Sequence, residues 1–156
     1  MKNNKTIKSW HLIFLFAIVI FSIFLKFYQN HFSDTVVILN GQKLNVLIAE
    51  TIYQQHKGLG GRGSLKPYDG MIFPYGIPTK PTMVMRDMEF PIDIVWLYDG
   101  EVVDIAPNLP IEPNTPEGYL TMYYPRKQAN LVLELPAGWS NRNKLKIGDK
   151  LTLVED

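Results

Sequence analysis

Several acidic residues that are spaced closely enough to act together in catalysis lie in the middle of the chain. Asp87, Glu89 and Asp93 fall within seven residues of one another, and Glu134 lies in a later apolar run. Two carboxyl groups that face each other across a cleft can act as general acid and base, as in glycoside hydrolysis. These residues therefore raise the hypothesis of a hydrolase in which Asp93 works with Asp87 or Glu134.

Asp93 is the most informative of these acids because of the strand around it. In the run 92–98, strand alternation places Asp93 with Val95 and Leu97, and the opposite face is apolar as well. A strand that is buried on both faces can hold an ionised carboxylate only if the carboxylate is paired or accepts several hydrogen bonds. Arg62 and Arg86 are candidate partners, since a guanidinium matches a carboxylate in a fork geometry. Asp93 is thus either a structural clasp that pins the glycine-rich loop, through Arg62 or through backbone N–H groups, or a ligand-facing carboxylate in a pocket.

The other ionisable residues suggest less chemistry. Glu134 alternates with Asn130 and Val132, which predicts a half-exposed strand position, and His56 is predicted to be exposed on a short helix. A single histidine cannot form a common zinc site. The sequence contains no cysteine, which excludes disulfides, thiolate zinc sites and cysteine nucleophiles. We predict no metal site and no cofactor.

The run HKGLGGRGSL at 56–65 contains a glycine pattern that is also found in nucleotide-binding loops. Gly58, Gly60 and Gly63 match G-x-G-x-x-G, the pattern of a loop that holds a dinucleotide. That mechanism needs a helix after the last glycine, so that the pyrophosphate rests on the helix N-terminus. Here a helix precedes the glycines, because Thr51 and Gln54 form a capping box and Gly58 follows two turns later. The glycines are therefore predicted to be a helix cap and a tight loop, not a nucleotide site.

The remainder of residues 34–156 has the pattern of short β-strands. Asn40-Gly41 and Asp99-Gly100 are two-residue hairpin signals, each between two apolar runs. Prolines cluster at 74–81 and 107–116, which indicates long exposed loops. The predicted fold class is mainly β (β-rich α+β), a partly open barrel or sandwich with one short helix. The strands are expected at 35–39, 44–48, 71–73, 82–85, 92–98, 101–105, 131–135 and 151–154.

An apolar run at 10–28 precedes this domain. Three lysines lie before the run, and the sequence after it has no small-residue cleavage site of the kind that a signal peptide needs. Spanning a bilayer takes about 17–25 residues, and basic flanks stay on the cytoplasmic side. We predict a cytoplasmic basic tail at 1–9, a membrane anchor at 10–28 with a signal peptide as the alternative, and a single domain at 34–156. The domain would lie outside the cytoplasmic membrane, in a periplasmic or extracellular location.

The charge of the domain excludes one class of partner. Four of the 16 lysine and arginine residues precede Asp34, while all 15 acidic residues lie at or after it, so the domain has 12 basic residues and a net charge of −3. Such a domain has no basic field to attract nucleic acid. We therefore expect no nucleic-acid partner, and the expected partners are the membrane through residues 10–28 and a small ligand or an envelope protein.

Several short motifs follow one another in a recognisable order: GMIF at 70–73, MRDM at 85–88, PIDIV at 91–95, VLELPAG at 132–138 and IGD at 147–149. Their order and spacing resemble the prokaryotic family called domain of unknown function 192. The resemblance implies a compact β-rich domain that is often carried behind a signal peptide or membrane anchor. It implies no particular activity, because none is generally assigned to the family.

The combined prediction is a non-catalytic envelope module that binds a small ligand or a partner protein. The site is expected between the 58–65 loop, the 85–93 segment and the proline-rich loops. The alternatives are the carboxylate-pair hydrolase described above and a structural or assembly role, which a large exposed apolar patch would favour. The candidates for ligand binding or for a structural clasp are Arg62, Met85, Arg86, Asp87, Asp93 and Glu134.

Overall fold

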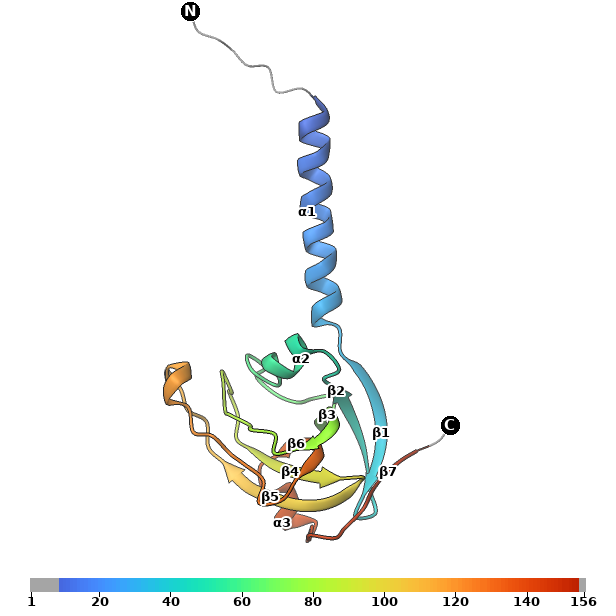
Figure 1. Cartoon of the computed structure of the whole chain (residues 1–156), viewed down its shortest axis with the longest axis vertical. Coiled ribbons are helices and arrows are strands. Elements are labelled where there is room, and N and C mark those ends of the chain that lie inside the picture. Colours follow the sequence, from blue (N-terminus) through green and yellow to red (C-terminus); the bar gives the residue numbers. More distant parts are fainter. Residues whose placement is uncertain (1–8, 155–156) are drawn as a thin grey trace, which may run out of the picture. The chain divides into compact units, whose positions relative to one another are not determined.

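The computed structural model describes residues 9–154, so most of the predicted tail at 1–9 lies outside the described residues. The chain divides into two compact units, one ending at His31 and the other beginning at Phe32. The first unit contains one helix, α1 (Ser9–Asn30) (Figure 1). Within the described part of the chain, no helix has the length and apolarity that crossing a membrane requires. The predicted transmembrane anchor at 10–28 is therefore not supported.

The second unit is built on one curved sheet, with short helices in its connections (Figure 1). The strands are β1 (Ser33–Leu39), β2 (Gln42–Ile48), β3 (Gly70–Thr79), β4 (Ile92–Tyr98), β5 (Glu101–Leu109), β6 (Ala129–Pro136) and β7 (Leu151–Leu153). The helices are α2 (Ile52–Lys57), the 3₁₀ helix η1 (Glu117–Tyr119) and α3 (Trp139–Arg142). The predicted mainly β architecture is confirmed as an open half-barrel.

Strand order explains where the connections must run. The sheet has the order β5-β4-β6-β3-β2-β1-β7, and every neighbouring pair is antiparallel except β2 with β3. A parallel pair needs a crossover connection, because a tight hairpin reverses the chain direction. Residues 49–69 form this crossover, and they contain α2 and the glycine-rich loop. Helix α2 therefore lies in the connection between the parallel strands β2 and β3.

Local chemistry sets the turns and the helix ends as predicted. Asn40-Gly41 has φ values of 49° and 75°, and Asp99-Gly100 has 47° and 79°, which is the positive-φ pair of a type I′ hairpin turn. Thr51 and Gln54 form the complete capping box, and Gly58 ends α2 with a φ of 50°. The predicted strand at 82–85 is wrong, since only Met83 there makes a β-bridge, to Tyr123.

The two edges of the sheet approach each other at one end. The N–H of Val102 in β5 donates to the carbonyl of Asp149, and Gly148 N–H donates back to the Val102 carbonyl. Leu151, the first residue of β7, donates to the Gly100 carbonyl. These bonds use backbone groups that edge strands would otherwise leave unpaired, and they close the half-barrel locally.

Register places the side chains of the central strands in two apolar layers. Ile94 in β4, Glu134 in β6 and Met71 in β3 are direct neighbours across the sheet, so they share one face. Asp93 and its neighbour Leu135 lie on the opposite face. The first face is covered by the crossover and the 82–90 segment, and Trp96, which is 1% exposed, donates its indole N–H to the Pro81 carbonyl.

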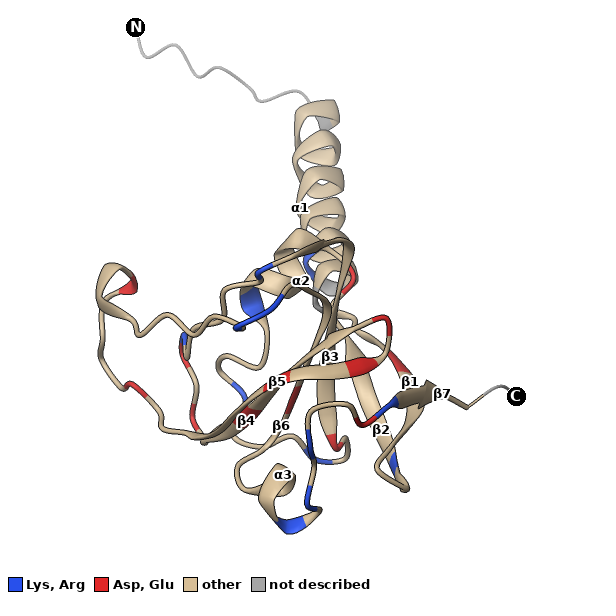
Figure 2. Cartoon of the chain, turned by 60° about the horizontal axis from the view of Figure 1, so that its bottom comes forward, with Lys and Arg blue, Asp and Glu red and all other residues tan. Residues whose placement is uncertain are grey.

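Charged residues do not collect by sign on the second unit. Lysine and arginine are interspersed with aspartate and glutamate along its ribbon (Figure 2). Most of these charged residues are exposed. Within the described residues, three acids are buried: Asp93, Asp104 and Glu134. These three are the charges whose environment needs an explanation.

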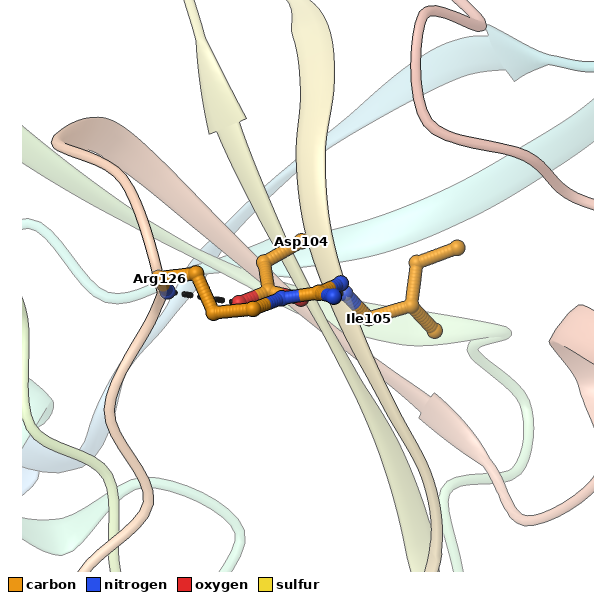
Figure 3. A network of polar contacts seen from close by, with 3 residues as sticks. All are labelled: Asp104, Ile105 and Arg126. Carbon is orange, nitrogen blue, oxygen red and sulfur yellow. Dashed lines mark hydrogen bonds and ion pairs between the residues drawn. The ribbon is translucent and has the colours of Figure 1, made fainter.

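Asp104 fastens the long connection between β5 and β6 to the sheet (Figure 3). Its carboxylate accepts hydrogen bonds from the backbone N–H, Nε and Nη2 of Arg126 at 2.6, 2.9 and 2.5 Å, and from the N–H of Ile105 at 2.9 Å. Burial by itself would raise the pKa of Asp104, but these hydrogen bonds outweigh it and hold the pKa below its ordinary value. The connection that is fixed in this way carries η1 and Met122 toward the candidate site.

Candidate functional site

A cavity of about 350 Å³ lies on the first face of the sheet, between the crossover and the 82–88 segment. Its floor is formed by Phe73 and Tyr75 of β3 and Glu134 of β6. One wall is residues 55–60, from α2 and the glycine-rich loop, and the mouth includes Glu117 of η1. The volume falls in the range of about 300–1,000 Å³ that pockets for small organic molecules occupy.

Glu134 is the unusual group in this cavity. Glu134 is 4% exposed, and its Oε2 atom has no hydrogen-bond partner among the described residues. Burial raises the pKa of Glu134 from 4.5 to about 8, and burial is the only cause of that rise. The carboxyl group is therefore mostly protonated at neutral pH. The predicted half-exposed position was wrong, because β6 lies between β3 and β4 and both of its faces are covered.

The groups around Glu134 are soft and apolar. Tyr75 is half-buried and points its hydroxyl at the sulfur of Met83, with an Oη to Sδ distance of 3.8 Å. Burial, and in second place the charge of Glu134, raise the pKa of Tyr75 above its ordinary value. Met88 and Met122 add two further thioethers to the lining. Thioethers adapt to irregular apolar ligands, and the faces of aromatic rings attract cations.

Arg86 ties together the three segments at the mouth. Its Nε donates to Oε2 of Glu117 at 2.7 Å, its Nη2 donates to Oε1 of the same carboxylate, and its Nη1 donates to the His56 carbonyl at 2.7 Å. The pKa of Arg86 is raised by this hydrogen-bonded carboxylate, and the pKa of Glu117 is lowered in return. Arg86 is therefore committed to fixing the mouth and does not act on the buried carboxyl group.

The glycine-rich loop forms its wall by close backbone contact. A Cβ atom at Gly60 would lie 2.8 Å from the Arg86 carbonyl oxygen, and Gly61 N–H donates to the Asp87 carbonyl at 2.8 Å. Only glycine permits that approach at position 60. Gly58 ends α2, as predicted, so the pattern G-x-G-x-x-G serves a helix cap and a packed loop here.

Asp93 is a clasp of a different kind from the one predicted. It is 0% exposed and accepts four hydrogen bonds: from the N–H groups of Asn108, Gly138 and Ser140 at 2.8 Å each, and from the Ser140 hydroxyl at 2.5 Å. The predicted contact with Arg62 or Arg86 and with the glycine-rich loop is wrong, because Asp93 lies on the face of the sheet that is turned away from them. Its partners instead join the end of β5 to the start of α3.

The carboxylate pair of the predicted hydrolase does not form. Asp93 and Glu134 lie on opposite faces of the sheet, since Asp93 pairs with Leu135 and Glu134 pairs with Ile94. Asp87 is exposed and lines a neighbouring hollow of about 360 Å³ beside Gly61. Neither arrangement offers two carboxyl groups facing one water or substrate atom, which that chemistry requires.

The remaining candidates are separated as well. Met85 is fully buried in the core, and the Arg62 guanidinium lies over the Phe32 ring with a distance of 5.2 Å to the ring centroid. Of the six predicted candidates, the structure brings Arg86 and Glu134 into the main cavity, and Arg86 and Asp87 into the neighbouring hollow.

The comparisons with known proteins agree with the fold. A model of the family DUF192, described as Uncharacterized ACR, matches residues 35–153. The chain belongs to the DUF192 family. No curated protein matches it.

Two solved structures show how the DUF192 fold is shared. One, from Sinorhizobium meliloti 1021 and provisionally described as a transcription regulator, has a TM-score of 0.69 and 26% identity, over 78% of this chain and 95% of that chain. The other, a protein of unknown function from Novosphingobium aromaticivorans DSM 12444, has a TM-score of 0.64 and 29% identity, over 78% of this chain and 84% of that chain. This chain is similar to both in fold.

Tyr75 and Met88 lie in two segments where the sequence predicted the site, 74–81 and 85–93. Other lining residues of this DUF192 cavity were missed from the sequence, namely Phe73, Met83, Glu117 and Met122. They come from four separate segments of the chain. The structure extends β3 to Thr79, so Phe73 and Tyr75 share a face, whereas the sequence predicted a loop at 74–81. Alternation did predict that Val132 and Glu134 share a face. The sequence did not indicate that these two faces are one and the same, which depends on the pairing of β3 with β6.

Proposed function

We propose that this DUF192 domain is a non-catalytic module that binds a small organic ligand in the cavity below α2. The observation that carries the proposal is the Glu134 carboxyl group, which is buried at the floor of a 350 Å³ cavity with Oε2 unpartnered among the described residues. A buried polar group without a partner destabilises a fold by about 1–3 kcal/mol. A ligand that binds Glu134 would supply the missing partner.

The rest of the site fits binding better than catalysis. Aromatic and thioether side chains lie beside Glu134, and the polar side chains of residues 55–57 line the wall. The mouth is held by the bidentate pair of Arg86 and Glu117, and no second carboxyl group faces Glu134 from the cavity floor. Aromatic and apolar side chains combined with a small number of placed polar groups are the usual design of a small-molecule site. A carboxyl group with a strongly perturbed pKa in a cavity is a candidate for a functional group.

A ligand screen tests this proposal. The full chain, with isotope-labelled methionine and isoleucine methyl groups, would be screened by NMR against a library of small polar and apolar molecules. A ligand of the cavity should shift the methyl signals of Met83 and Met88 and leave that of Ile105, which packs in the other apolar layer, unchanged. Hits that shift only signals outside the cavity would refute the proposal.

We also propose, from the sequence, that residues 10–28 hold the domain at the outer side of the cytoplasmic membrane. The apolar side chains of α1, from Trp10 to Leu25 and at Tyr28, are between 39% and 68% exposed, and water is a poor environment for so much apolar surface. Fractionation of cells tests this location: the full chain should sediment with membranes, and detergent but not alkaline buffer should release it. A chain that stays in the supernatant would contradict it.

A further inference from the structure

We infer that the ligand of the cavity is an organic cation, a protonated amine on an apolar body, which places its ammonium group on the carboxylate of Glu134. This inference rests on the proposed binding function and names its ligand class. The floor offers one acidic group, and the surfaces around it are the rings of Phe73 and Tyr75 and the thioethers of Met83 and Met88. Such surfaces receive an alkyl chain and also favour a nearby positive charge.

No ion pair joins Glu134 to a lysine or arginine within the part of the chain that the structure describes. Arg86 is bound to Glu117 and to the His56 carbonyl. Lys57 also lines the cavity, yet neither cation contributes to the pKa of Glu134, for which burial is the only cause. An anionic ligand would oppose the ionisation of this acid, whereas a cation would stabilise its ionised form.

The size and donor set of the cavity favour an organic cation over a metal ion. A volume of about 350 Å³ is far larger than one ion needs and matches a small organic molecule. No group of three His, Asp or Glu side chains with metal-site geometry occurs within the described residues. The ligand body therefore fills the space between β3 and the 82–88 segment.

Binding of a cation must release a proton. With a pKa of about 8, Glu134 is mostly neutral at pH 7, and an ammonium group stabilises its ionised form. The proton of the Glu134 carboxyl group leaves to solvent as the ion pair forms. The affinity for a cation should therefore rise with pH up to about 8, by roughly 50-fold between pH 6 and pH 8.

Other titratable groups that face the cavity can be separated from this effect. Tyr75 stays neutral in this range because its pKa is raised above its ordinary value of 10.0. Arg86 keeps its charge because its hydrogen-bonded partner Glu117 raises its pKa, and Glu117 is already ionised because Arg86 lowers its pKa. His56, on α2, is the remaining lining residue whose type titrates near neutral pH. A His56→Gln variant removes that contribution.

The experiment compares three probes of equal length on the full chain in a non-ionic detergent: hexylammonium, 1-hexanol and hexanoate. Binding is followed by the methyl signals of Met83 and Met88 at pH 6 and pH 8.

Hexylammonium should bind most tightly at pH 8 and lose roughly 50-fold in affinity at pH 6. Glu134→Gln should abolish both the preference and the pH dependence. Glu101→Gln, a change at an exposed acid outside the cavity lining, should keep them. In His56→Gln, the pH dependence that remains is the part that Glu134 contributes.

The outcomes separate this inference from the proposed function. The cation inference is overturned if 1-hexanol or hexanoate shifts the same methyl signals more strongly than hexylammonium does. It is also overturned if the affinity for hexylammonium does not change, or falls, as the pH rises. In both cases the proposal of binding in the cavity stands. The same holds if Glu134→Gln binds hexylammonium as well as wild type does. If none of the probes shifts the Met83 and Met88 signals at millimolar concentrations, the cavity is not a binding site and both proposals fail.

Discussion

Replacing Glu134 by Gln should make the ligand-free protein more stable at alkaline pH. Glutamine has the shape of the protonated acid but cannot ionise. In the folded wild type the pKa of Glu134 is about 8, whereas an unperturbed glutamate has 4.5. Between these values the unfolded chain loses the proton and the folded chain keeps it, so the stability of the wild type falls as the pH rises.

The size of the effect follows from the two pKa values. Below pH 4.5 both states are protonated and Glu134 contributes no pH dependence. From 4.5 to about 8 the interval is 3.5 pH units, and each unit is worth about 1.4 kcal/mol, which gives a ceiling of about 5 kcal/mol. Above pH 8 both states are ionised and the difference becomes constant. A loss of this size is a large fraction of the 5–15 kcal/mol, roughly, that stabilises a typical domain.

The assay is denaturant unfolding of the full chain, followed by tryptophan fluorescence, from pH 5 to pH 9. Trp96 reports on the core because it is 1% exposed. The free-energy difference between Glu134→Gln and wild type should widen steadily up to pH 8 and then level off. Glu101→Gln, at an exposed position, is the matched control and should follow the wild type. Parallel profiles for wild type and Glu134→Gln would refute the reasoning, because they would show that Glu134 titrates alike in the folded and unfolded chain.

Three further results are expected. Asp93→Asn should lose about 3 kcal/mol or more in denaturant unfolding, because the new amide nitrogen cannot accept hydrogen bonds and leaves buried N–H groups unpaired; an unchanged midpoint would contradict the clasp. Gly60→Ala should lose about 1–3 kcal/mol, since its Cβ would lie 2.8 Å from a carbonyl oxygen, whereas Gly76→Ala, with open space around its Cβ, should change little. Equal stability of these two variants would count against the close contact. In a truncation that lacks residues 10–28, the remaining domain should move from the membrane to the soluble fraction, and continued sedimentation would show that another segment holds it.

The sequence predicted those parts of the fold that depend on neighbouring residues. Asn40-Gly41 and Asp99-Gly100 set their hairpins because a type I′ turn needs two positive φ values, which few residue pairs accept. The capping box at Thr51 and the end of α2 at Gly58 are likewise local, since each bond spans three or four residues. The family resemblance, confirmed over residues 35–153, added the β-rich character.

The candidate site could be predicted only in part because its contacts are not local. Alternation showed that Asp93 and Glu134 interrupt apolar strands, but it did not show what each one faces. Asp93 receives its hydrogen bonds from residues 15, 45 and 47 positions away, and the surroundings of Glu134 depend on β6 lying between β3 and β4. An apolar run that contains one acid is consistent with an edge strand or with a central strand, and only the order of the strands decides.

The single parallel step between β2 and β3 divides the site into two parts that are free to change separately. The floor, with Glu134, belongs to the central strands, where a substitution disturbs pairing on both sides. The wall at 55–60 belongs to the crossover at 49–69, which must reach the start of β3 and packs against the 82–88 segment at Gly60. Insertions or substitutions in that connection would reshape the space for the body of a ligand and leave the carboxyl group in place. Over evolutionary time, such a chain can exchange one ligand for another of similar charge without rebuilding its sheet.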